Sequence, residues 1–197
     1  PVEAVCLPQL VVKNSWRALE ALGAASRTRF PGRVIGVTGS CGKTTFKDLL
    51  ARLLGPRCHK TEANLNNTLG VPLTLCGLDA GAHDFAVVEA GINEPGEMAT
   101  MAAMIRADLG VVTTVQPVHL EKLGSIGNIA REKCRLLETA SEALIPASCL
   151  SFVPFRKLGP PQTILQLDRG GSRTPFTFGL GPQYRVDDTA EGRCAIT

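Results

Sequence analysis

The sequence lacks the features that mark several specialised classes of protein. Its 197 residues contain no apolar run close to the ~18 residues of a membrane span. The chain starts with Pro-Val-Glu-Ala-Val, which is neither basic nor strongly apolar, so no secretory signal is expected. The formal net charge is only +3 and aromatic residues make up only 5% of the chain, which argues against a nucleic-acid-binding surface. We therefore expect neither membrane insertion nor a nucleic-acid partner.

Cysteine is present, but not in a pattern that indicates a metal site or a disulfide framework. No two of the seven cysteines have the two-residue separation of a zinc knuckle or a redox dithiol. The odd number also leaves one cysteine unpaired in any complete set of intrachain disulfides. Such cysteines are commonly small apolar fillers in a reducing compartment. We therefore expect a cytoplasmic protein, and a monomer.

The chain contains enough apolar material for a buried core. Apolar residues make up 44% and charged residues 20%, and the length fits one large domain or one domain with an appendage. Residues 1–31 differ from the rest, because we expect a helix capped by Asn14 or Ser15 and then a linker at residues 27–33. The apolar residues of that helix are Trp16, Leu19 and Leu22. We therefore divide the chain into residues 1–31 and 32–197.

From Arg33 onwards, expected strands and helices alternate. The expected strands are 33–38, 85–89, 109–115, 163–167 and 174–178, and the expected helices are 44–54, 95–106 and 125–139. Nearly continuous apolar strands separated by amphipathic helices are typical of a parallel sheet covered on both faces. The sequence therefore predicts a three-layer α/β fold with a mostly parallel sheet, helices on both faces and extra edge strands near the C-terminus.

The strongest motif is a glycine-rich segment between the first strand and the first helix of this alternation. It reads Gly36-Val-Thr-Gly-Ser-Cys-Gly-Lys-Thr-Thr45. Gly39 and Gly42 would let backbone amides close around phosphate oxygens at the positive end of the helix dipole. Lys43 would add a charge for the β- and γ-phosphates, and the Thr44 hydroxyl would bind Mg²⁺. Val37 stands where the strict pattern has glycine, and an ordinary turn is the alternative, but the flanking strand and helix favour a nucleoside triphosphate site.

Two further polar residues follow strands. Glu89 ends the strand 85–89, and His119 follows the next strand. Ligands of an open α/β sheet bind beyond the carboxyl ends of its strands, so both residues should converge on the phosphate site. A carboxylate there suits Mg²⁺, which prefers oxygen ligands. The alternatives are a solvated glutamate and a loop histidine without a role, which is what we expect for His59 and His83.

Four segments together resemble the Mur ligases, the enzymes that add amino acids to the bacterial cell-wall precursor. They are residues 38–45, 61–75, 118–125 and 129–133. The last three are most similar to the family branch that joins D-alanyl-D-alanine to UDP-N-acetylmuramoyl-tripeptide. The resemblance runs from about residue 10 to about residue 190, with its specific motifs between residues 34 and 138.

The resemblance implies a two-step ligation. ATP phosphorylates the terminal carboxylate of the UDP-linked tripeptide, and the amino group of D-alanyl-D-alanine attacks the resulting acyl phosphate. Family members also carry an N-terminal domain and a C-terminal domain, for which 197 residues leave no room. We therefore expect residues 1–31 to be the end of the N-terminal domain with its linker, and residues 32–197 to be the central ATPase domain. Such a chain would bind nucleotide without ligating by itself.

The resemblance also implies roles for individual residues. The loop residues expected to hold ATP are Thr38, Gly39, Ser40, Cys41, Gly42, Lys43, Thr44 and Thr45. Thr44 and Glu89 would bind one Mg²⁺, and His119 would belong to a second metal site. Lys133 matches a family lysine that reacts with CO₂ to form a carbamate, which requires an amine with a lowered pKa. The alternative is an exposed lysine on an amphipathic helix.

An asparagine cluster completes the implied site. Asn64, Asn66 and Asn67 match residues beside the family's active site, although capping of a turn or helix is an alternative for Asn66 or Asn67. One asparagine could serve each purpose.

Four positions depart from the family pattern. Ala63 replaces a Gly, Thr114 and Gln116 replace an Asn and a Gly, and Pro146 replaces an Asn that helps hold the nucleotide base. Adenine recognition by the segment around Pro146 should therefore differ from that of the family. The open alternatives are another ligase of the superfamily, of the folylpolyglutamate or cyanophycin synthetase type, and a nucleotide-binding module without turnover.

Overall fold

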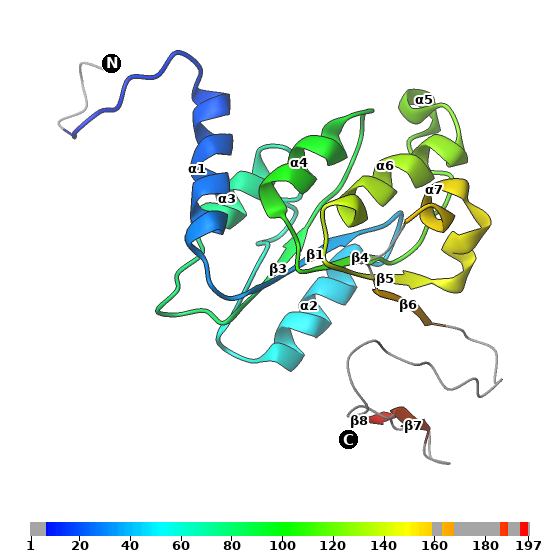
Figure 1. The fold of residues 1–197 in the computed structure, drawn as a ribbon. Helices are drawn as coiled ribbons and strands as arrows, with labels where there is room; N and C mark the ends of the chain where they lie inside the picture. Colours follow the sequence, from blue (N-terminus) through cyan, green and yellow to red (C-terminus); the bar gives the residue numbers. More distant parts are fainter. Residues whose placement is uncertain (1–6, 159–162, 168–185, 189–193, 197) are drawn as a thin grey trace.

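A single parallel sheet forms the centre of the molecule. A computed structural model of the chain describes residues 7–158, 163–167, 186–188 and 194–196. Its strands pair in the order β2-β3-β1-β4-β5-β6, all parallel (Figure 1). They are β1 (Arg33–Thr38), β2 (Cys58–Lys60), β3 (Phe85–Glu89), β4 (Leu109–Val112), β5 (Glu142–Pro146) and β6 (Thr163–Leu167). Two short strands, β7 (Val186–Asp188) and β8 (Cys194–Ile196), form an antiparallel pair.

The helices cover the two faces of the sheet unequally. One face carries only α2 (Lys43–Leu54) among the described helices, whereas the opposite face carries several (Figure 1). Those are α1 (Ser15–Arg29), α3 (Gly70–Cys76), α4 (Glu97–Ile105) and α6 (Ile126–Glu138), with the short α5 (Leu120–Leu123) and α7 (Val153–Arg156) and a 3₁₀ turn at Ala147–Ser151 beside them. The predicted three-layer α/β fold with a parallel sheet and a C-terminal edge strand is confirmed.

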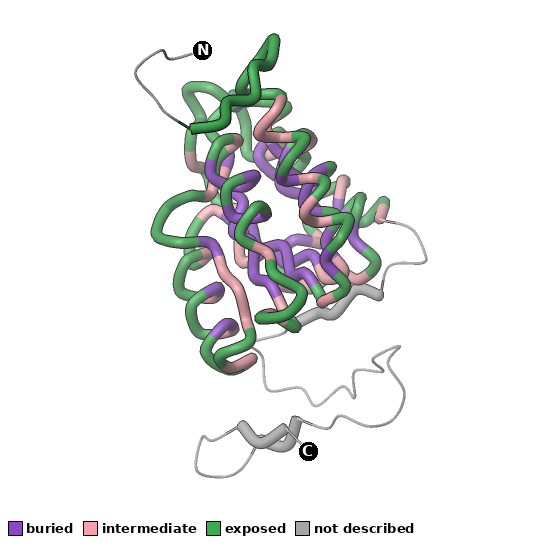
Figure 2. Tube along the Cα trace, turned by 90° about the vertical axis from the view of Figure 1, so that its left-hand side faces the viewer, coloured by how far each residue is buried: buried purple, intermediate pink, exposed green. Residues whose placement is uncertain are grey.

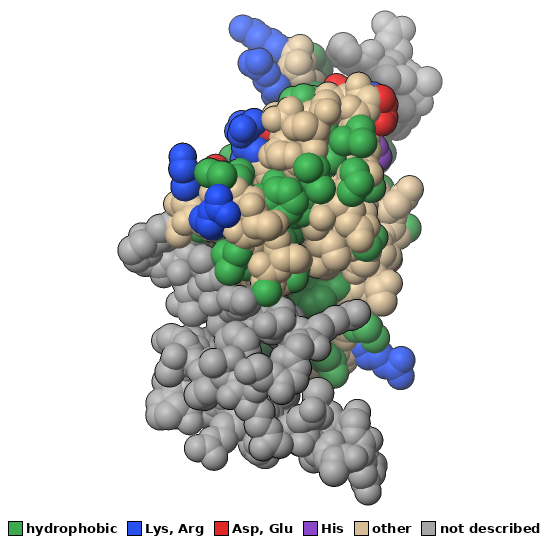
Figure 3. Space-filling view, turned by 90° about the vertical axis from the view of Figure 1, so that its right-hand side faces the viewer, with side chains coloured by type: hydrophobic (Ala, Val, Ile, Leu, Met, Phe, Trp, Pro, Cys, Tyr) green, Lys and Arg blue, Asp and Glu red, His purple; other side chains and the backbone are tan. Residues whose placement is uncertain are grey.

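Alternation along the strands sends apolar side chains to both faces of the sheet, and the described residues form three apolar clusters. In β1, Val34 packs with Val88 and Leu136 on the face that carries several helices. Ile35 and Val37 pack on the other face, towards α2. Figure 2 shows the buried residues gathered on the central strands and on the helix sides that face them. On the face shown in Figure 3, exposed hydrophobic side chains are interspersed with polar groups, and Lys and Arg lie towards the margins. No helix in the described part of the chain combines the length and apolar character that crossing a bilayer requires.

The observed bounds of the strands and helices agree with the predicted ones where the apolar pattern of the sequence is strong. The strands at 33–38, 85–89 and 163–167 lie where expected, but β4 ends at Val112 instead of residue 115. The helix α4 begins after its N-cap Gly96 and not at Pro95, because Gly96 has a φ of 89°. The elements β2, α3 and β5 were not predicted, since each is short and contains a charge or a proline. The predicted strand 174–178 lies outside the described residues.

Helix α1 begins as predicted, after its cap at Asn14. The Asn14 side chain accepts a hydrogen bond from Arg17 N at 2.9 Å and caps the helix. Two of the apolar residues that indicated the helix lie on its surface, because Trp16 is 49% and Leu22 is 57% exposed. The helix instead approaches α3 through Gly23, where an added Cβ would lie 2.8 Å from the Pro72 Cα atom. The helix also runs to Arg29, so the expected linker is shorter than predicted.

One arginine ties the end of α1 to the body of the domain. Arg27 donates to the carbonyl oxygens of Ile105 at 2.9 Å and Arg106 at 2.8 Å, and to Asp108 Oδ2 at 3.1 Å. The two carbonyls belong to the C-terminal end of α4, where the helix itself offers no donors. Asp108 Oδ2 also accepts from Val34 N at 2.7 Å. The guanidinium therefore joins α1, α4 and β1.

We predict that Arg27→Met lowers the free energy of unfolding by about 2 kcal/mol, because the carbonyls of Ile105 and Arg106 lose the Arg27 donor and Asp108 keeps only the Val34 amide. Urea unfolding followed by circular dichroism measures this change. The exposed Arg29, in the same helical turn, provides the matched control, and Arg29→Met should change stability by less than ~0.5 kcal/mol. Equal effects of the two substitutions would contradict the prediction.

Candidate functional site

The glycine-rich loop between β1 and α2 uses its glycines for two different reasons. Gly39 has a φ of 154°, and a Cβ atom there would collide with Thr113 Oγ1. Gly42 has a φ of 78° and open space around it, so only its left-handed backbone requires glycine. Gly42 is the N-cap of α2 and offers no side chain to the first amides of that helix. A helix N-terminus of this kind favours an anion.

The segment after β4 holds this loop in place. Ser40 N donates to Thr114 O at 2.9 Å, and Ser40 Oγ exchanges hydrogen bonds with the backbone O and N of Gln116 at 3.0 and 2.8 Å. Cys41 N donates to Thr114 Oγ1 at 3.2 Å. Thr114 and Gln116 are two of the positions that depart from the family pattern. Thr114 holds the loop partly through its hydroxyl, whereas Gln116 contributes only its backbone.

The polar side chains of the loop point to the edge of the sheet. Lys43 Nζ donates to Gly39 O at 3.0 Å, so the ammonium group lies over the loop. The hydroxyl of Thr38, at the end of β1, is buried and has no hydrogen-bond partner in the described structure. Thr45 faces away from this group and lines a separate apolar pocket described below. The loop thus combines a cation, a buried hydroxyl and a helix N-terminus.

Glu89 is the centre of a buried polar cluster. Its carboxylate accepts hydrogen bonds from Thr44 Oγ1 at 3.1 Å and from Asn66 Nδ2 at 2.8 Å. Lys47 Nζ lies 3.8 Å from Glu89 Oε2. Glu89 is fully buried, so the alternative of a solvated strand-end glutamate is wrong. A hydroxyl and a carboxylate beside a helix N-terminus fit Mg²⁺, which takes few protein oxygens and completes its shell with phosphates and water.

A second group of residues encloses a cavity of about 130 Å³ next to the loop. Its polar side chains include Lys43, Asn66, His119 and Lys133. His119 precedes α5, has a φ of 53° and places Nδ1 3.9 Å from Glu121 Oε1. A non-glycine residue in the left-handed region is uncommon, and such conformations concentrate at functional sites. The cavity brings His119 and Lys133 to the edge at which β1 and β3 end.

Lys133 is buried, so the alternative of an exposed lysine on α6 is wrong. Burial lowers the pKa of its ammonium group from 10.5 to about 7, and the nearby charge of Lys43 adds to this effect. Near neutral pH the side chain is therefore partly an uncharged amine, which is a nucleophile. Within the described residues, no group of three or more His, Cys, Asp and Glu side chains is arranged to hold a metal ion.

The three asparagines have separate positions. Asn66 reaches Glu89 and the cavity, whereas the Asn67 side chain accepts from the amides of Leu69 and Gly70 and caps α3. Asn64 lies in an exposed turn, where its carbonyl accepts from Asn66 N. The structure therefore brings one of the three predicted asparagines to the cavity, and helix capping explains Asn67.

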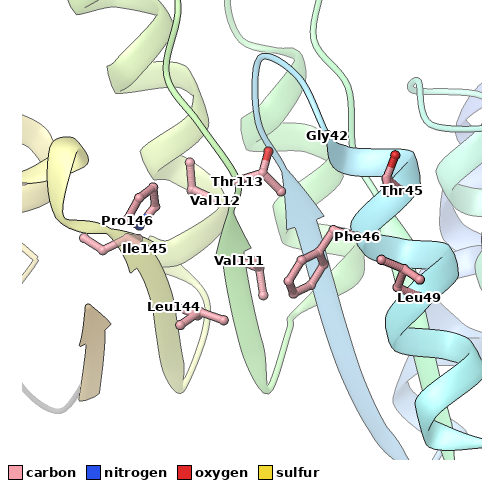
Figure 4. A pocket seen from close by; sticks show the side chains of 10 residues that line it. All are labelled: Gly42, Thr45, Phe46, Leu49, Val111, Val112, Thr113, Leu144, Ile145 and Pro146. Carbon is pink, nitrogen blue, oxygen red and sulfur yellow. The ribbon is translucent and has the colours of Figure 1, made fainter. Parts of the chain in front are cut away.

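A larger apolar pocket of about 400 Å³ adjoins the start of α2 (Figure 4). Side chains from α2, β4 and β5 line it, and Figure 4 shows Phe46 and Leu144 on opposite sides of Val111. Pro146, at the end of β5, closes one side. Thr113 also lines the pocket, but its hydroxyl donates to Cys41 O at 2.6 Å. The pocket was not predicted, because its residues are ordinary apolar residues in the sequence.

Lys47 is a further buried polar residue near the loop, and the sequence analysis predicted no role for it. It is one turn after Thr44, and its buried ammonium donates to Thr61 O at 2.9 Å and Ala63 O at 3.3 Å. The only signal was its helical spacing from Thr44, which places both on one side of α2.

The fold and the loop define a three-layer α/β protein with a glycine-rich loop at one edge of its sheet, and comparisons with known proteins give the family. Residues 37–152 match the model of the Mur ligase middle domain. The chain therefore belongs to the Mur ligase family.

Individual relatives agree with this assignment. A UDP-N-acetylmuramoyl-tripeptide–D-alanyl-D-alanine ligase from Synechocystis is 42% identical over 141 residues, which is 70% of this chain and 31% of the relative. MurF from Acinetobacter baumannii superposes with a TM-score of 0.74 at 29% identity, covering 86% of this chain and 38% of that one. MurF from Thermotoga maritima in complex with ADP gives 0.69 at 27% identity, covering 83% and 40%. The chain spans about a third of the length of the curated relatives it matches.

We predict that Lys133→Met stabilises the fold most at low pH. Between pH 7 and 10.5 the unfolded lysine binds a proton that the folded one releases, so the free energy of unfolding of the unmodified chain rises with pH in this window. The advantage of Lys133→Met should therefore be full at pH 6 and should shrink towards pH 10. Urea unfolding in CO₂-free buffer measures it, with the exposed Lys157→Met as the control for a lost charge. An advantage that is constant from pH 6 to pH 10 would contradict the prediction.

Proposed function

We propose that this chain is the ATP-binding part of a ligase that joins D-alanyl-D-alanine to UDP-N-acetylmuramoyl-tripeptide in cell-wall precursor synthesis. The observation that carries the proposal is the convergence of the glycine-rich loop, Glu89, His119 and Lys133 at one edge of the sheet. The names of the relatives support the substrates, and the ADP complex of the Thermotoga maritima neighbour supports ATP. No observation favours the folylpolyglutamate or cyanophycin alternatives.

The proposed reaction needs a site that brings two anions together. The γ-phosphate of ATP must meet the substrate carboxylate, which is a poor electrophile until phosphorylation gives it a leaving group. Lys43 and the first amides of α2 would hold the phosphates, and Lys43 would balance charge during the transfer. The amine of D-alanyl-D-alanine would then displace phosphate from the acyl phosphate.

Two Mg²⁺ sites accompany this proposal. Thr44 and Glu89 would hold one ion, and the hydroxyl and carboxylate oxygens fit its preference. His119 and a carbamate on Lys133 would hold the second. When bound, Mg²⁺ would neutralise the phosphate charge and polarise the transferred phosphoryl group. The lowered pKa of Lys133 supports the carbamate, because only an uncharged amine attacks CO₂.

The nucleotide base would occupy the apolar pocket beside α2 (Figure 4). The pocket begins at Gly42 and Thr45, next to the proposed phosphate site, so one ligand can span both. Val111, Leu144 and Pro146 offer apolar contact and no side-chain amide, unlike the asparagine that Pro146 replaces. The described lining would therefore bind the base through its ring faces.

The chain would combine the end of one domain with most of a second. Residues 1–31 would end an N-terminal domain that binds the UDP-linked substrate, and residues 32–197 would form the central domain. The exposed apolar residues of α1 support a surface that another domain covers; they include Trp16 and Leu22. A reaction that consumes ATP would occur in the cytoplasm, and we expect a monomer.

Titration of the chain with ADP and with inorganic tripolyphosphate, each in Mg²⁺, tests the nucleotide site. Lys43→Ala should weaken both ligands at least about tenfold, because the phosphates lose a charge-assisted contact. Leu144→Glu should weaken ADP but not tripolyphosphate, because it places a charge only in the base pocket. Isothermal titration calorimetry gives the affinities.

The exposed Leu53, on the far end of α2, provides the control for the second variant, and Leu53→Glu should leave both affinities unchanged. If neither Lys43→Ala nor Leu144→Glu changes the affinity for ADP, the proposed site is wrong.

The carbamate proposal predicts a ¹³C resonance of a lysine carbamate when the chain is equilibrated with ¹³C-bicarbonate. Lys133→Arg should remove the resonance, because a guanidinium stays protonated and does not react. A spectrum without the resonance in the unmodified chain, or one that persists in Lys133→Arg, would exclude Lys133 as the modified residue.

A further inference from the structure

Lys47 is a buried cation to which the proposed chemistry gives no role. It lies in α2 with its side chain 2% exposed, and its ammonium donates to the carbonyls of Thr61 and Ala63. Taking an ammonium out of water costs several kcal/mol unless its partners compensate. The carbonyl groups that accept from Lys47 must therefore stay in place to compensate this cost.

The segment that Lys47 contacts is joined to Glu89 at both ends. At one end, Glu89 N donates to Thr61 Oγ1 at 2.9 Å. At the other end, Asn66 Nδ2 donates to Glu89 Oε1 at 2.8 Å, and Asn66 O accepts from Gly91 N at 2.7 Å. Between them Ala63 has a φ of 45°, which is unfavourable for alanine, and its carbonyl points to Lys47. Residues 61–66 thus form a bridge from the end of β2 to Glu89. Lys47 contacts this bridge through the carbonyls of Thr61 and Ala63.

Lys47 and Glu89 form a buried ion pair. At 3.8 Å the ammonium attracts the carboxylate without a direct hydrogen bond. Both carboxylate oxygens therefore stay available to Thr44 and Asn66, which orient them. Asp48 lies 3.6 Å from the same ammonium, but it is half exposed and already bound to Lys60 at 2.6 Å. The buried charge that faces Lys47 is that of Glu89.

We propose that Lys47 is a positioning residue of the nucleotide site. Its ammonium fixes the Glu89 carboxylate and the carbonyls of residues 61–63 relative to α2, so that Thr44, Glu89 and Asn66 are aligned before a magnesium–nucleotide complex binds. The inference rests on the proposed nucleotide site. Its physical basis is preorganisation, because donors and acceptors that are already in place lose little freedom when the ligand arrives.

The variant Lys47→Met keeps the apolar stem and removes the charge. Hydrogen–deuterium exchange of the ligand-free chain should show amides of residues 61–67 exchanging about tenfold faster, because the bridge loses its central donor. Titration with ADP should show that Mg²⁺ raises the affinity of the unmodified chain, and that Lys47→Met loses most of this gain. Arg52→Met is the matched control, since Arg52 is an exposed cation on the same helix, and both measurements should stay unchanged there.

The outcomes separate this inference from the proposed function. If the unmodified chain does not bind ADP with Mg²⁺, the proposed nucleotide site fails. If it binds, and Lys47→Met preserves both the Mg²⁺ dependence and the slow exchange of residues 61–67, the inference about Lys47 alone is overturned. A purely structural role would lower the unfolding temperature without changing the gain from Mg²⁺, and this result would also overturn it.

A second variant covers the case in which Lys47→Met does not fold. The double variant Lys47→Met, Glu89→Gln removes both members of the buried charge pair, so folding should be restored if Lys47 balances Glu89. Urea unfolding measures the recovery. A double variant that remains unfolded would mean that Lys47 supports the fold independently of Glu89, and the proposal would be wrong.

Discussion

The buried carboxylate of Glu89 is the group on which the geometry of this site depends. Water cannot solvate a fully buried charge, so the protein must supply its donors. Thr44 comes from the start of α2, Asn66 comes from the segment after β2, and Lys47 adds a cation from the next turn of α2. Satisfying this one anion therefore ties the end of β3 to two other parts of the chain, the start of α2 and the segment after β2.

The two lysines that face the cavity differ in burial and therefore in chemistry. Lys43 lies over the glycine-rich loop with its ammonium on the Gly39 carbonyl. Lys133 is enclosed by α6 and its neighbours, and burial moves its pKa to about 7. One residue suits the binding of phosphate, and the other suits a reaction of the free amine. A single structural variable, access to water, separates the two roles.

The unequal covering of the sheet explains the second pocket. Because α2 is the only described helix on its face, the apolar surface of β4 and β5 beside its N-terminus is left open (Figures 1 and 4). Val111 and Leu144 therefore form an apolar wall next to a loop that favours anions. A nucleotide has the same division into an apolar base and charged phosphates. The architecture supplies both surfaces in one place.

The sequence by itself determined the α/β class, the strands β1, β3, β4 and β6, and the glycine-rich loop, whereas β2 and β5 were not predicted. Apolar runs define β1 and β3 because a strand buried on both faces must be apolar throughout, and the glycines of the loop mark left-handed backbone that other residues avoid. Parallel strands end at the same edge, so Glu89 and His119 could be placed together without coordinates.

Tertiary structure alone decided which polar residues are buried and what they contact. Lys133 looked like an exposed helix lysine, Lys47 carried no motif, and the asparagines could not be told apart until Asn66 met Glu89 and Asn67 met the start of α3. The sequence likewise did not predict which side of α1 packs against α3, or that an apolar pocket adjoins α2. Burial and pairing depend on which segments meet in space, and local sequence patterns do not contain that information.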